Sequence, residues 1–139
     1  MVELAAATAM AQRDSLAGRV RDELALAGLP IVAADMSPHL RQSGAEVRVD
    51  KLANCHAPVR VEWRTDRTLQ EMFQRVAMAE QVDAPVFRHY QMVVETMLQT
   101  MTEILSAAGF TVRGSTNDFA PLTLEILDGP RSASPWSSR

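Results

Sequence analysis

The fold is decided by residues 83–109, DAPVFRHYQMVVETMLQTMTEILSAAG, where nothing between Pro85 and Gly109 breaks a helix. The apolar residues from Val86 to Ala108 recur in steps of three and four, so they share one stripe of a 3.6-residue helix. Asp83 is expected to cap the free N–H groups of the first turn, and Gly109 to end the helix in a left-handed conformation. We therefore predict a long helix over residues 84–108 whose apolar stripe lies in the core.

Shorter patterns before and after this stretch predict the other elements. The spacing of Leu16, Val20 and Leu24 indicates a helix within residues 2–27. Thr68 and Glu71 have the spacing of a capping box, which would open a short second helix. Four segments alternate apolar and polar residues and are expected to form strands, namely 45–50, 59–64, 110–113 and 122–127. The apolar segment 30–34 is a candidate fifth strand.

The order of these elements indicates the fold class. It predicts an α+β two-layer sandwich, with the helices packed on one face of a mainly antiparallel sheet of four or five strands. The chain has 139 residues, which suits a single domain over residues 1–128. Residues 129–139 are expected to form a flexible C-terminal tail, because their composition offers too little apolar surface to order them.

Composition limits the class of partner. The formal net charge is −3 and the pI about 5.6, so we do not expect the basic surface that nucleic-acid binding requires. Cys55 is the single cysteine, which rules out an internal disulfide. The first residues lack the basic start of a signal peptide, and no apolar run reaches the length of a membrane span. We expect a cytoplasmic protein without membrane contact.

The polar residues of the predicted strands share one side of the sheet, which we name the polar sheet face. Arginine is enriched in the cores of protein interfaces, so this face is our preferred functional surface, with Arg48, Arg60, Glu62 and Arg64 as candidate binding residues. The alternative is an ordinary solvated face whose charges pair across strands. The face comprises Glu46, Arg48, Asp50, Arg60, Glu62, Arg64, Thr111, Arg113, Thr123 and Glu125.

Two helix starts carry further candidate binding residues. Arg64 and Arg67 flank Asp66 before the short helix, and arginines at a helix N-terminus can hold an anion. The alternative is that Asp66 caps the helix or pairs with these arginines. His89 and Tyr90 lie near the start of the long helix, where they could line a pocket between that helix and the sheet, or pack locally without a ligand.

Two last features are a cysteine beside a histidine and a lone tryptophan. Cys55 and His56 are adjacent on a predicted loop, and adjacent residues of an extended loop point apart, so we expect no thiolate–imidazole pair. Trp136 in the tail could anchor a partner. The sequence carries no phosphate-binding glycine loop, nucleophile elbow or metal-ligand spacing, so we predict no catalytic residues, metal or cofactor.

These observations favour a small cytoplasmic binding or accessory protein. It would act through a protein–protein surface formed by the polar sheet face, the tail or both, and we expect it to self-associate. The alternative function is a small-molecule-binding domain or enzyme, with a pocket between the long helix and the sheet.

Overall fold

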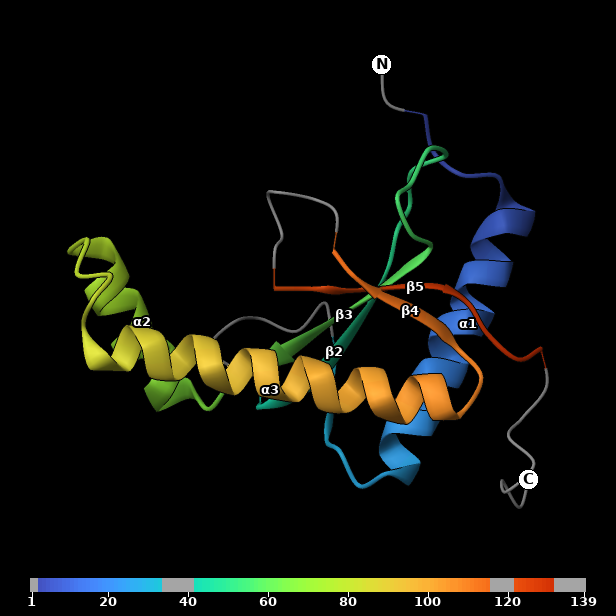
Figure 1. Ribbon diagram of the computed structural model, residues 1–139. Coiled ribbons are helices and arrows are strands. Elements are labelled where there is room, and N and C mark those ends of the chain that lie inside the picture. The colour runs from blue at the N-terminus through green and yellow to red at the C-terminus, as the bar shows by residue number, and fades with distance from the viewer. Residues whose placement is uncertain (1–2, 34–41, 116–121, 132–139) are drawn as a thin grey trace.

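A computed structural model describes residues 3–33, 42–115 and 122–131 of the chain. Figure 1 shows a twisted sheet with α1 and α3 packed against it, while α2 lies beyond the end of the sheet, beside the N-terminal part of α3. The elements in chain order are α1 (Ala7–Leu26), β1 (Ile31–Val32), β2 (Gly44–Val49), β3 (Val59–Arg64), α2 (Arg67–Met78), α3 (Pro85–Ala107), β4 (Thr111–Gly114) and β5 (Leu124–Asp128).

The predicted fold class is confirmed. The sheet has five strands in the order β1-β2-β3-β5-β4, so the apolar segment after the first helix does supply a fifth strand. The sheet is mixed rather than mainly antiparallel, because β1 runs parallel to β2 while the other three pairings are antiparallel.

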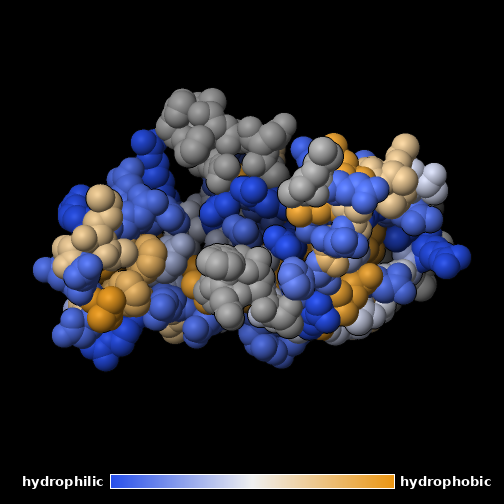
Figure 2. Space-filling model, turned by 90° about the horizontal axis from the view of Figure 1, so that it is seen from above, coloured by the Kyte–Doolittle hydropathy of each residue, from blue (hydrophilic) through white to orange (hydrophobic). Residues whose placement is uncertain are grey.

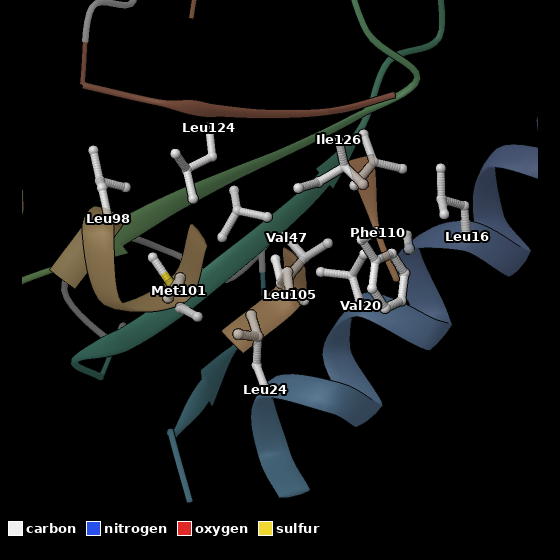
Figure 3. Close-up of a cluster of buried hydrophobic side chains, with 14 of the residues drawn as sticks. Leu16, Val20, Leu24, Val47, Leu98, Met101, Leu105, Phe110, Leu124 and Ile126 are labelled. Atoms are coloured by element: carbon white, nitrogen blue, oxygen red, sulfur yellow. The ribbon is translucent and has the colours of Figure 1, made fainter. Parts of the chain in front are cut away.

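The core lies between the sheet and the helices α1 and α3. Figure 3 shows Leu16, Val20 and Leu24 of α1 pointing toward the same interior as Leu98, Met101 and Leu105 of α3. The sheet contributes Val47, Val61, Leu124 and Ile126 from the strand positions that alternate with the polar ones. Each fully buried side chain of this size stabilises the fold by about 1.5–3 kcal/mol, so this layer dominates stability.

Gly44 permits the close approach of β1 to β2. Its φ is +147°, a conformation that favours glycine, and an added Cβ would lie 2.5 Å from the carbonyl oxygen of Pro30. The main-chain N–H of Ala45 donates to that same oxygen at 2.8 Å. The parallel pairing of β1 with β2 therefore requires glycine at residue 44.

The helix starts differ from the predicted caps. The N-cap of α3 is Ala84, which has no capping side chain, so the prediction that Asp83 caps this helix is wrong; Asp83 lies one residue too early. The capping box is also displaced, because Asp66 is the N-cap of α2 and accepts a hydrogen bond from the N–H of Thr68 at 2.9 Å. This leaves Glu71 free to pair with Arg67 at 3.0 Å.

The helix α2 is held mainly by aromatic contacts with α3. Phe73 stacks on Tyr90 with ring centroids 3.9 Å apart and lies 5.1 Å from Phe87. No residue of α2 is buried, because the helix lies beyond the sheet and, among the described elements, packs mainly against α3. Met78 is 87% exposed, and Figure 2 shows hydrophobic residues at the surface on the end that carries α2 in Figure 1.

The first helix is shorter than predicted, and the last strand leads into a packed turn. The helix α1 begins at Ala7 rather than at residue 2 and runs through Gly18 without interruption. After β5, Gly129 lies against the ring of Phe110, where an added Cβ would clash. The described part of the predicted tail therefore begins against the core, and residues 132–139 lie outside the described residues.

Candidate functional site

The polar sheet face lies opposite α1 and α3. Strand pairing places Ala45, Val47, Val59 and Val61 on the core side, so the residues between them point the other way, as predicted. No described helix packs on this second side. It is nevertheless not evenly exposed, because the side chains of Glu46, Asp50 and Glu125 are more buried than those of the arginines they pair with, whereas Glu62 is as exposed as Arg64.

The register of β2 and β3 sets like charges directly opposite each other. Glu46 faces Glu62, and Arg48 faces Arg60. Such pairs are destabilising unless each charge finds an opposite partner nearby. The opposite charges come from diagonal positions on the neighbouring strand and from positions two residues away on the same strand. Glu46, Glu62, Arg48 and Arg60 therefore belong to a network of ion pairs.

Glu46 is the centre of that network. Its side chain is completely buried, and its carboxylate accepts hydrogen bonds from Arg64 Nε at 2.7 Å, from Arg64 Nη2 at 3.1 Å and from the guanidinium of Arg48. Burial by itself raises the pKa of Glu46, but the hydrogen bonds from Arg64 and Arg48 outweigh it, so the pKa lies below the ordinary glutamate value of 4.5. Arg64 also contacts Glu62 at 3.0 Å.

Glu125 forms a second, smaller centre on β5. Its side chain is also completely buried, and Arg113 Nε of the neighbouring strand β4 donates to its Oε1 at 2.7 Å. Arg113 is further held by the carbonyl oxygen of His56, at 3.1 Å from Nη2. Arg60 lies directly opposite Glu125 on β3, yet it pairs with Asp50 at 3.4 Å. Arg60 Nε and Glu125 Oε2 are both buried, and neither has a hydrogen-bond partner among the described residues.

The arrangement fixes guanidinium groups at the surface. Arg48 and Arg113 each form an ion pair with a wholly buried carboxylate. Their own side chains stay 43% and 42% exposed. The face carries four arginines and four acids in all, so its charges balance. It therefore offers positioned hydrogen-bond donors without a strong net field.

The start of α2 does not form an anion site from its described side chains. Arg67 is 68% exposed and forms an i, i+4 ion pair with Glu71, while Asp66 caps the helix. Arg64 points to Glu46 on the sheet instead of joining Arg67, and its hydrogen bond with Glu46 raises the pKa of Arg64. The predicted cluster is therefore divided between a helix cap and the sheet network.

The start of α3 does not bring its candidate residues together. His89 is exposed, whereas Tyr90 is half-buried, stacks on Phe73 and donates a hydrogen bond to Gln70 at 3.3 Å. Burial raises the pKa of Tyr90, and the nearby Arg64 opposes this only in part. Two hollows lined by described residues lie elsewhere, one between α1 and β5 and one at the edge of β2. A pocket between α3 and the sheet stays a prediction.

The remaining candidates carry no assembled chemistry. Cys55 is a free, partly exposed thiol, and His56 contributes its main-chain carbonyl to Arg113. Within the described ranges, no group of histidine, cysteine and acidic side chains could hold a metal ion. None of the helices in the same ranges is long and apolar enough to cross a membrane. Trp136 lies outside the described residues.

Four residues of the network, Glu46, Asp50, Arg113 and Glu125, were placed on the face but were not predicted as binding residues. Glu46 and Glu125 alternate with valine, leucine and isoleucine, a pattern that is typical of solvated acids on a strand. The arginines at neighbouring polar positions indicate that Glu46 and Glu125 could be buried as ion pairs. Which arginines are neighbours, however, follows only from the strand order.

Comparisons with known proteins give no relative for this chain. No family model matches it, and neither the curated proteins nor the solved structures contain a significant match.

Proposed function

We propose that this chain is a small cytoplasmic binding protein that recognises a partner protein through the polar sheet face. The observation that carries the proposal is the pair of buried carboxylates, Glu46 and Glu125, each holding a half-exposed arginine. The expected cytoplasmic location is supported by the single cysteine, which requires no oxidising compartment.

The energetics support recognition over simple solvation. Removing a carboxylate from water costs several kcal/mol, and hydrophobic residues of similar size would often stabilise a fold as well or better. The buried acids therefore contribute little to the stability of the fold, but they hold guanidinium groups in fixed positions. Arginine is also the charged residue most enriched in protein interfaces, and holding it in place before binding reduces the entropy lost on association.

The same face supports self-association. It carries four arginines and four acids, so two copies related by a two-fold axis would not repel each other through a net charge, and the exposed parts of Arg48 and Arg113 could donate to the partly exposed Glu62 of the other copy. We propose this as one form of the protein–protein contact, and the oligomeric state in solution distinguishes it from a contact with a different protein.

A capture experiment with matched variants tests the proposal. The variant Arg48→Ala/Arg60→Ala removes two face arginines while Glu46 keeps Arg64, so the fold is expected to survive. The control Arg75→Ala/Arg88→Ala removes two exposed arginines from α2 and α3. Each protein is immobilised, exposed to host lysate and compared by quantitative mass spectrometry, with thermal melts to confirm folding.

The expected result is a protein retained in stoichiometric amount by the wild type and the control, and lost with the face variant. Sedimentation of the purified proteins shows whether the retained partner is a second copy. Equal retention by the folded face variant would contradict the proposal.

A further inference from the structure

The outer edge of β2 contains a notch. The strand β1 pairs only with Ala45 and Glu46, and no described strand continues alongside Val47–Val49. Beyond the notch, the N-terminal segment resumes the pairing, with Ala5 N–H donating to the carbonyl oxygen of Lys51 at 2.9 Å. A hollow of about 670 Å³ lies at this interruption.

The main chain of β2 points into the notch at two residues. Ala45 N–H donates toward β1, whereas Asp50 N–H donates toward β3, to the carbonyl oxygen of Pro58. Because successive strand residues present their main-chain groups to alternate edges, those of Val47 and Val49 face the notch. Val47 is only 1% exposed, and Arg21 of α1 reaches its carbonyl oxygen at 3.3 Å. Val49 is partly exposed and the described chain pairs no strand with it on this side, so Val49 is the open position of the edge.

The charged residues that line the hollow are all cations, namely Arg21, Arg48 and Lys51. Arg48 shares its charge with Glu46, and Lys51 forms no ion pair with a described residue. The rest of the lining is apolar and includes Val32 and Val49. An edge of main-chain donors and acceptors, an apolar wall and an excess of positive charge are thus combined in one place.

We infer that this notch binds a short extended peptide segment that carries carboxylates, adding two or three residues of strand to the edge of β2. Main-chain hydrogen bonds would hold the segment, as in other cases of strand addition, and the cations would select acidic side chains. The inference rests on the proposed function only in taking a protein as the partner, and it names a different contact surface and the chemistry of the segment.

The test is an NMR titration of the full-length protein with defined peptides. The probe is a capped pentapeptide of alternating valine and glutamate, and the control is the same peptide with lysine for glutamate. Glutarate serves as a free dicarboxylate. We expect the glutamate peptide alone to shift the amide resonances of Ala33 and Val47–Val49, and its affinity to fall as salt rises.

Two matched variants separate main-chain pairing from charge. Val49→Pro removes the N–H that faces the notch without removing a bond to β3, and Val49→Ala shortens the same side chain but keeps the N–H. We expect the proline variant to lose binding and the alanine variant to retain it. Lys51→Glu is expected to weaken binding by about tenfold or more through charge reversal.

The outcomes are distinguishable from those of the proposed function. Arg60→Ala changes the polar sheet face but not the notch, so it should bind the peptide normally even where the face proposal fails. Equal binding of the lysine peptide, equal shifts with glutarate, or unchanged binding by folded Val49→Pro would each overturn the inference. Concentration-dependent shifts at the notch without peptide would also overturn it, because a second copy would then occupy the edge.

Discussion

The ion pair of Arg113 and Glu125 predicts an asymmetry between its two partners. Glu125 is wholly buried, whereas 42% of the Arg113 side chain is exposed. Arg113→Met leaves a buried carboxylate without its partner, a change that typically costs 3–5 kcal/mol. Glu125→Leu leaves an arginine that water can still reach, and it removes the unpaired oxygen Oε2.

The surroundings of Glu125 narrow the expected loss in free energy of unfolding for Arg113→Met. Arg60 lies opposite Glu125 and has a buried Nε without a partner, so in Arg113→Met it could turn toward the carboxylate. We therefore expect a loss near the lower limit, about 3 kcal/mol, for Arg113→Met. For Glu125→Leu we expect a change of less than about 1 kcal/mol, because the exposed guanidinium stays hydrated.

Urea unfolding at neutral pH measures the free energy of unfolding of both variants and of the double variant. The double variant should recover most of the loss of Arg113→Met, since it removes both charges together. The reasoning is refuted if Glu125→Leu is the more damaging single change, or if the double variant is as unstable as Arg113→Met.

Further expected outcomes concern three other parts of the fold. Gly44→Ala should destabilise the folded protein by about 2 kcal/mol or more, because the added Cβ would meet main-chain atoms in a conformation that favours glycine. Gly18→Ala lies in open space within α1 and should stabilise the folded protein by about 0.5–1 kcal/mol. Equal denaturant midpoints for the two variants would contradict both expectations. The lowered pKa of Glu46 means that its contribution to stability is present above the ordinary value of 4.5 and is lost as the pH falls through the lower pKa of the folded state. Thermal melts over that acidic range should show a flatter pH dependence for Glu46→Gln, and an unchanged slope would exclude the network as its source. Phe73→Ala should cost about 2–3 kcal/mol through the lost aromatic stack, whereas Met78→Ala, 87% exposed, should cost almost nothing in the same urea assay.

Local patterns predicted the elements well, because each depends on residues close in sequence. The stripe around Leu98 and Leu105 marked the long helix within one residue at each end, and the strand over residues 59–64 was predicted with its observed bounds. The caps were predicted less well. A capping side chain must sit at one particular position, and a shift of one residue moves Asp83 out of reach.

The interior of the candidate site could not be predicted, because it depends on long-range pairing. The alternation of β2 and β3 placed Arg48 and Arg60 on the right face, but only the register sets them opposite each other. The burial of Glu125 requires β5 to lie between β3 and β4, and the sequence leaves that order open. The same limit applies to α2, because the sequence predicts a short helix after the second long strand but does not show that this helix extends past the sheet and buries none of its residues.

The polar sheet face and the notch should respond differently to salt, which links the two proposals to one observable. The face balances four arginines against four acids, so screening changes attraction and repulsion together and has little net effect on association. The notch has an excess of positive charge, so its affinity for an acidic segment and the rate of encounter should both fall with salt. Arg48 belongs to both surfaces, and its guanidinium is held by Glu46 in either case. A partner that covers the face and inserts a segment into the notch would therefore show a salt dependence that Lys51→Glu removes and Arg60→Ala leaves intact.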